Sequence, residues 1–317
     1  MTHAGAFDRR RSAFHARQLS PGGEEPLDES LGLMGMGRST TFPFPQWRAN
    51  DEFRTVYFDV GEGPQTLVLV HGLGANLTHW EYVAKYLARR YRVLGLDLPG
   101  CGASLKPRRR YTLDLLRDHL LGFLDEHGVE HPTLVGHSLG GAVCLAATLE
   151  RPGLAERLVL VGGACVARLP AWMRRGAPLF LHERLLYPTL RFGHNFILRN
   201  VFVDGPAENE FVRHFRQMAL RDDLGFPHLH DFARVSATLC RDIVERDFSG
   251  QLPTLDIPIL GIWGKADKLT PLSDVRASLA RAPRSRLIVL ERCGHMPMVE
   301  RPHDVLYHVE QFLKNPP

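Results

Sequence analysis

The most informative segment of the sequence is Val135-Gly-His-Ser-Leu-Gly-Gly141. It begins in an apolar run at residues 133–135, which is typical of a buried strand, and it leads into residues 139–151, which are typical of a helix. A G-x-S-x-G sequence at such a strand–turn–helix junction forms a sharp turn that exposes the serine hydroxyl at the carboxyl end of the strand. We therefore expect Ser138 to be a nucleophile.

Further apolar runs and helical segments lie on both sides of this stretch. The runs typical of strands buried on both faces are residues 66–70, 91–96, 133–135, 157–161, 257–262 and 286–290. The helical segments are residues 80–90, 112–127, 139–151, 271–281 and 302–313. Residues 53–59 alternate like an antiparallel strand. This alternation predicts an α/β fold, in which helices wrap a mostly parallel sheet.

The alternation stops at residues 167–252, which carry helical spacing and many large apolar side chains but no strand-like run. We interpret them as a helical cap inserted between two strands. Residues 1–53 are rich in glycine, proline, serine and charge, and they predict a largely flexible N-terminal tail. The sheet core then comprises residues 54–166 and 253–315.

A serine nucleophile needs a base, and the base needs an orienting carboxylate. His295 follows the last predicted strand and Asp267 follows the strand before it, so both lie at the same sheet edge as Ser138. For the oxyanion hole we expect the backbone N–H groups of Leu139, directly after the nucleophile, and of Leu73, in a glycine-rich turn after another strand.

Five segments carry a family resemblance. They are His71-Gly-Leu-Gly74 with Trp80, Asp97-Leu-Pro-Gly-Cys-Gly-Ala-Ser104, Gly136-His-Ser-Leu-Gly140, Trp263-Gly-Lys-Ala-Asp267 and Gly294-His-Met-Pro-Met-Val-Glu-Arg-Pro302. With them the sequence resembles the α/β-hydrolase fold family, in its serine-nucleophile branch of capped esterases and lipases. The resemblance implies an eight-stranded, mostly parallel sheet with a helical cap inserted after the sixth strand, a Ser138–His295–Asp267 triad and no cofactor or metal. It excludes the branch with an aspartate nucleophile.

Five further residues are candidates for the substrate pocket because they flank these motifs: His71, Gly72, Trp80, His137 and Met296. For the two histidines we favour a structural role over direct chemistry. The resemblance makes Asp97 a hydrogen-bond acceptor that shapes its loop.

The preferred function is hydrolysis of a carboxylic ester through an acyl-enzyme on Ser138. Two alternatives stay open: hydrolysis of a carbon–carbon bond in a vinylogous diketone, or other acyl chemistry on the same triad, and a non-catalytic ligand-binding member of the fold. The histidine before the nucleophile favours esters.

The composition limits the classes of molecule that we expect this protein to bind. The chain has 39 basic and 35 acidic residues and a net charge of +4, which gives no reason to expect nucleic acid. Its five cysteines lack CxxC spacing, so we expect reduced thiols.

The oligomeric state is left open. No apolar run approaches the ~20 residues of a membrane span, and no secretory signal is visible, so we expect a cytoplasmic protein, with peripheral membrane association left open. The expected partner is a small-molecule ester with an apolar acyl part.

Overall fold

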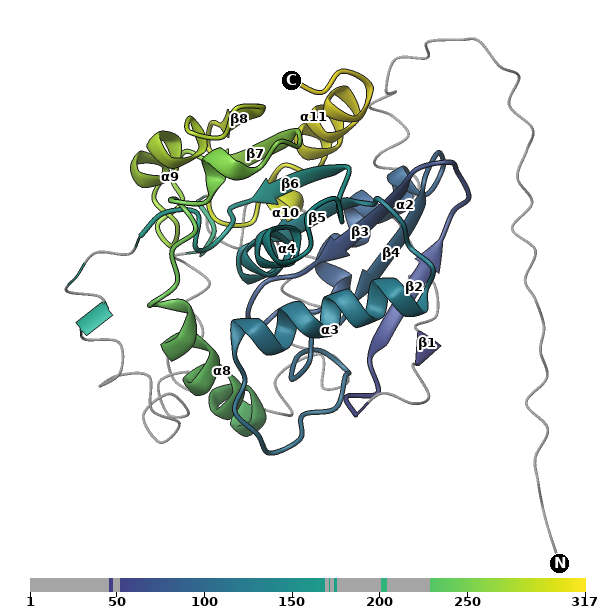
Figure 1. Cartoon of the computed structure of the whole chain (residues 1–317), viewed down its shortest axis with the longest axis vertical. Helices are drawn as coiled ribbons and strands as arrows, with labels where there is room; N and C mark the ends of the chain where they lie inside the picture. Colours follow the sequence, from purple (N-terminus) through teal and green to yellow (C-terminus); the bar gives the residue numbers. More distant parts are fainter. Residues whose placement is uncertain (1–45, 48–51, 169–170, 172–173, 176–200, 204–228) are drawn as a thin grey trace, which may run out of the picture. The chain divides into compact units, whose positions relative to one another are not determined.

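The part of the chain that the structure describes is built on an eight-stranded sheet (Figure 1). This computed structural model describes residues 46–47, 52–168, 171, 174–175, 201–203 and 229–317. The strand order is β1-β2-β4-β3-β5-β6-β7-β8. The strands are Gln46–Trp47 (β1), Val56–Val60 (β2), Thr66–Val70 (β3), Arg92–Leu96 (β4), Thr133–His137 (β5), Arg157–Val161 (β6), Ile259–Gly264 (β7) and Ser285–Leu290 (β8).

The sheet is mostly parallel, as the sequence predicts. Strands β3 to β8 pair in parallel, whereas β2 runs antiparallel to β4 and β1 antiparallel to β2. Every residue of β5 and of β7 is buried. This burial explains why these strands read as continuous apolar runs, because helices cover both faces of a parallel sheet.

The order of the strands places the helices on two faces. The described helices are η1 (Leu77–Trp80), α2 (Glu81–Leu87), α3 (Leu113–Glu126), α4 (Leu139–Glu150), α8 (Leu229–Ile243), η3 (Leu252–Thr254), α9 (Leu272–Leu279), α10 (Pro297–Glu300) and α11 (Pro302–Lys314). The connection from β3 to β4 runs in the opposite direction from the later ones. Right-handed crossovers therefore put α2 on the face opposite α3, α4 and α9. Helix α3 packs on α4, and α2 packs on α11.

Helix α8 is the main described part of the predicted cap, and it is fastened to the core next to α3. The backbone N–H of Tyr111 donates to Thr238 Oγ1 at 3.1 Å, and that of Leu113 donates to Asp242 Oδ2 at 2.8 Å. These bonds satisfy N–H groups at and before the start of α3 that have no partner within the helix. Helix α8 is therefore attached to the sheet core by these hydrogen bonds.

Predicted and observed elements differ chiefly at their ends. The strands at residues 66–70 and 157–161 agree at both ends, and the other predicted strands shift by one to three residues. Strand β1 lies inside the range expected to be a tail, and two residues are too short to produce a pattern. Most of the predicted cap, with most of its aromatic side chains, and residues 1–45 lie outside the described residues. Within the described residues, no helix is long and apolar enough to span a membrane.

Candidate active site

Ser138 occupies a strained turn between β5 and α4. Its φ and ψ are +50° and −116°, a conformation that residues with a side chain rarely adopt. The surroundings hold it there: Ser138 donates its N–H to the Val161 carbonyl at 3.0 Å. Its carbonyl accepts from the N–H groups of Ala142 at 3.2 Å and Ala164 at 2.9 Å. Backbone strain that the surrounding structure maintains in this way is typical of functional sites.

The two glycines of the G-x-S-x-G sequence are required by close backbone contacts. A Cβ atom on Gly136 would lie 2.4 Å from the carbonyl oxygen of Gly140, and one on Gly140 would lie 2.2 Å from that of Val70. Both distances are far inside van der Waals contact. Glycine therefore lets helix α4 start directly against β5 and β3, which fixes the position of Ser138.

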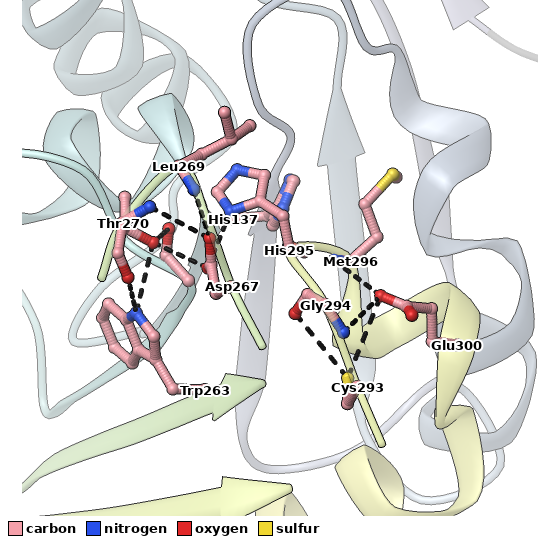
Figure 2. Close-up of polar contacts among 11 residues, drawn as sticks. His137, Trp263, Asp267, Leu269, Thr270, Cys293, Gly294, His295, Met296 and Glu300 are labelled. Atoms are coloured by element: carbon pink, nitrogen blue, oxygen red, sulfur yellow. Dashed lines mark hydrogen bonds and ion pairs between the residues drawn. The ribbon is translucent and has the colours of Figure 1, made fainter. Parts of the chain in front are cut away.

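The predicted acid and base form a pair at the same sheet edge (Figure 2). His295 follows β8, Asp267 follows β7, and His295 Nδ1 lies 2.8 Å from Asp267 Oδ2. A neutral His295 in this arrangement carries its proton on Nδ1 and leaves Nε2 able to accept one. Both side chains are buried.

Four hydrogen bonds hold the carboxylate of Asp267. Oδ1 accepts from the backbone N–H groups of Leu269 at 2.8 Å and Thr270 at 3.0 Å, and Oδ2 accepts from His295 and from Thr270 Oγ1 at 2.7 Å. Burial alone would raise the pKa of Asp267, but the hydrogen bonds from His295 and Thr270 outweigh it and hold the pKa below its usual value. The carboxylate is therefore ionised at neutral pH.

The predicted oxyanion turn lies directly against Ser138. A Cβ atom on Gly72 would be 3.1 Å from Ser138 Cβ. In the described part of the chain, the backbone N–H groups of Leu73 and Leu139 donate to no protein acceptor. Leu139 is the first residue of α4, where N–H groups have no partner within the helix. That these two groups bind the oxyanion stays a prediction.

His71, a pocket candidate, is a fully buried structural residue. Its Nε2 accepts the N–H of Leu98 at 3.0 Å, so its proton resides on Nδ1, which donates to the Gly72 carbonyl at 2.8 Å. Burial lowers its pKa to about 4, so the ring is neutral. Asp97 shapes the neighbouring loop as expected, because its carboxylate accepts the N–H groups of Leu77 and Ala103, each at 2.7 Å.

His137 supports the loop that carries the base. Its Nε2–H donates to the carbonyl oxygen of His295 at 2.9 Å, and the two rings lie 5.0 Å apart. Burial, with a smaller contribution from His295, lowers the pKa of His137 to about 3. The structural role favoured for His137 agrees with this contact. Trp80 and Met296 are buried side chains, and their place in a pocket stays a prediction.

Three residues of this region received no role from the sequence. Thr270 donates to Asp267, as described above. A Cβ atom on Gly162 would lie 3.4 Å from both Asp267 Oδ2 and His295 Nδ1. Glu300 accepts the N–H groups on both sides of His295. In the sequence, Gly162 could have drawn attention only because it directly follows a buried strand. Glu300 could have done so only because it lies within the motif Gly294–Pro302.

No group of three or more His, Cys, Asp or Glu side chains among the described residues could hold a metal ion. The five cysteines are free thiols, and four of them are buried.

Comparisons with known proteins agree with the fold and the motifs. A family model described as the alpha/beta hydrolase fold matches residues 65–302. The 2-hydroxy-6-oxononadienedioate/2-hydroxy-6-oxononatrienedioate hydrolase of Cupriavidus pinatubonensis is 30% identical over 274 residues, covering 83% of this chain and 92% of that protein. The pimeloyl–acyl-carrier-protein methyl ester esterase of Aeromonas hydrophila is 30% identical over 261 residues, covering 80% and 96%. The crystal structure of a hydrolase from Pseudomonas aeruginosa matches with a TM-score of 0.74 at 26% identity, covering 86% and 99%. This chain belongs to the α/β-hydrolase fold family.

Proposed function

We propose that this protein is a serine hydrolase that cleaves a carboxylic ester through an acyl-enzyme on Ser138. The observation that carries the proposal is the buried 2.8 Å contact between His295 Nδ1 and Asp267 Oδ2, at the sheet edge where the strained turn holds Ser138. An ionised carboxylate on Nδ1 keeps the other imidazole nitrogen ready to accept a proton.

The reaction proceeds in two steps. His295 Nε2 takes the proton of Ser138 Oγ as that oxygen attacks the ester carbonyl, and it then gives the proton to the departing alcohol. Water attacks the acyl-enzyme in the same way and releases the carboxylic acid. Asp267 stays ionised throughout and stabilises the imidazolium. The N–H groups of Leu73 and Leu139 bind the oxyanion, and each such donor contributes about 10²–10³ in rate.

The second candidate is hydrolysis of a carbon–carbon bond on the same triad. It is supported by the relative from Cupriavidus pinatubonensis, whose name gives a 2-hydroxy-6-oxo dienedioate as the substrate. The relative from Aeromonas hydrophila, at the same identity, is named a methyl ester esterase. The ester remains the preferred substrate because His137 stands before the nucleophile.

A non-catalytic ligand-binding role is the third candidate, and the site argues against it. A binding protein has no use for the strained Ser138 backbone together with an ionised Asp267 hydrogen-bonded to the imidazole of His295. Strain of this kind costs of order 1–3 kcal/mol, which folding alone gives no reason to retain.

A fluorophosphonate probe tests the nucleophile. Intact-mass spectrometry should show one adduct on the wild-type protein and none on Ser138→Ala. Equal labelling of both proteins, or no labelling of either, would rule out the acyl-enzyme mechanism on Ser138.

Two substrate series then separate the remaining candidates. Initial rates on p-nitrophenyl esters of increasing acyl length should be high and should decline in Asp267→Asn. The same preparations are assayed on a 2-hydroxy-6-oxo dienoate, whose cleavage is followed by loss of its absorbance. A kcat/KM that is much larger on the dienoate would replace the ester proposal by the carbon–carbon one.

A further inference from the structure

The loop between β8 and α10 presents His295, and its backbone is held from two sides. The N–H of His295 donates to the carbonyl oxygen of Val201 at 2.8 Å. The carbonyl of His295 accepts Nε2–H of His137 at 2.9 Å. Neither partner belongs to the loop itself, so other parts of the fold determine where the base sits.

Glu300 is the third support of this loop (Figure 2). Its carboxylate is buried, and Oε1 accepts the N–H groups of Gly294 at 2.9 Å and Met296 at 3.2 Å. These are the residues directly before and after His295. The other oxygen, Oε2, accepts the N–H of Val203 at 3.1 Å.

One carboxylate therefore links two segments that lie far apart in the sequence. The segment 201–203 belongs to the range 167–252, which follows β6 and was predicted to form the cap, whereas Glu300 ends α10. In this segment, the carbonyl oxygen of Val201 accepts the N–H of His295, and the N–H of Val203 donates to the carboxylate of Glu300.

We propose that Glu300 is a positioning residue for the catalytic base, which it aligns by tying the His295 loop to the segment 201–203. This inference rests on the proposed function, because it assigns Glu300 to the Ser138–His295–Asp267 triad. Glu300 acts through the backbone of the loop and not on the substrate. A displacement of about 1 Å in a catalytic group can lower the rate about 10²-fold.

Two substitutions of Glu300 separate the contact with the His295 loop from the contact with Val203. In Glu300→Gln, the amide oxygen stays where two N–H groups converge, at Gly294 and Met296. The amide –NH₂ then faces the N–H of Val203, and two donors cannot bond, so the bond to Val203 is lost while those to Gly294 and Met296 remain. Glu300→Ala removes both contacts.

The partner side of the link can be altered independently. Val203→Pro removes the N–H that donates to Glu300, whereas Val203→Ala keeps it and serves as the matched control. Glu81→Gln is a second control, because Glu81 is another buried glutamate, in α2, that pairs with Lys85 at 2.7 Å outside the site.

Kinetics on a p-nitrophenyl ester give the main measurement. We expect kcat to fall about tenfold in Glu300→Gln and Val203→Pro and about 10²-fold in Glu300→Ala, with KM within about threefold of wild type. The double variant Glu300→Gln/Val203→Pro should be no slower than either single one, because both remove the same bond. Both control variants should keep the wild-type kcat.

The Nδ1–H proton of His295 gives a measurement that does not depend on turnover. Its low-field NMR resonance reports the bond to Asp267, and Asp267→Asn identifies it by its loss. We expect this resonance to shift or broaden in both variants of Glu300 and to stay unchanged in Glu81→Gln. If Glu300→Ala does not fold, Glu300→Gln and Val203→Pro carry the test.

The inference is overturned if Glu300→Gln and Val203→Pro keep both the wild-type kcat and the wild-type resonance. It is also overturned if the loss of activity only follows the loss of folded protein, measured by circular dichroism at the assay temperature. A wild-type protein that does not react with the fluorophosphonate counts against the Ser138 nucleophile alone. The resonance then still decides whether Glu300 positions His295.

Discussion

Replacing Asp267 by asparagine should reverse the tautomer of His295. The oxygen of the asparagine must stay at the Oδ1 position, because the N–H groups of Leu269 and Thr270 converge there at 2.8 and 3.0 Å. The amide –NH₂ is then forced toward His295 Nδ1, which must accept. The imidazole proton moves to Nε2, so the ring can no longer take the proton of Ser138.

The size of the effect follows from the bonds that change. Loss of the charge-assisted bond to Nδ1 costs about 1.5–3 kcal/mol. Returning the ring to its reactive tautomer places two donors against each other, which costs about 1–3 kcal/mol more. The sum of roughly 3–6 kcal/mol corresponds to a fall of about 10²–10⁴ in kcat. In a well-studied serine protease the same exchange lowers kcat about 10⁴-fold.

Steady-state kinetics on a p-nitrophenyl ester, combined with thermal unfolding, measure this effect. Asp267→Asn should unfold close to the wild-type temperature, because both bonds to Oδ1 survive. Thr270→Val is the matched control: it removes the hydroxyl that donates to Oδ2 at 2.7 Å and keeps the backbone donor. That variant should lose less than tenfold. A loss below tenfold in folded Asp267→Asn would refute the assignment of Asp267 as the orienting acid.

Three further predictions concern stability and reactivity. Gly162→Ala should lower the free energy of unfolding by about 1–2 kcal/mol in urea denaturation, because φ is +54° and the new Cβ would lie 3.3 Å from the carbonyl oxygen of His295. Burial, with a smaller contribution from His295, lowers the pKa of His137 to about 3 in the folded protein. As the pH falls below about 6.5, the imidazole of His137 is therefore protonated in the unfolded chain but not in the folded one, and the protein loses stability. His137→Gln, whose amide can still donate to the His295 carbonyl, should therefore lose about 2 kcal/mol less stability than wild type between pH 7 and pH 5. The buried Cys293 thiol, whose pKa is raised chiefly by burial, should react with iodoacetamide only after unfolding.

Each of these three predictions has a result that would contradict it. An unchanged unfolding curve for Gly162→Ala would mean that the loop relaxes around the new side chain. An equal pH dependence of stability in wild type and His137→Gln would mean that His137 titrates normally in the folded protein. Inactivation of the native enzyme by iodoacetamide, with mass spectrometry locating the adduct on Cys293, would contradict its burial.

The sequence predicts the sheet well because burial produces its own pattern. Strands covered on both faces must be apolar throughout, and the runs at residues 66–70 and 157–161 coincide with β3 and β6. Strand β1 contains two residues, so no alternation exists to detect. Its pairing with β2 is a tertiary contact that leaves no local signal.

The candidate site, like the sheet, has residues that the sequence predicts and residues that it does not. The positions of Ser138, Asp267 and His295 follow from one rule, that the carboxyl ends of parallel strands meet at one edge. The contact of Thr270 depends on the conformation of its own loop, and the contact of Glu300 with Val203 depends on how two distant segments meet; neither leaves a periodic pattern in the sequence. Their partners lie three residues away in one case and on a segment about 97 residues away in the other.

The separation of the triad along the chain has a consequence for synthesis. Ser138 leaves the ribosome with its strand and its glycines, but the base follows 157 residues later. At about 5–20 residues per second, that interval lasts roughly 8–30 s. Under the proposed mechanism, Ser138 is an ordinary alcohol during this time, because the base that takes its proton has not yet been made. The loop between β8 and α10, which carries His295, thus completes the proposed triad late in synthesis, and a chain that ends before it would lack the proposed activity.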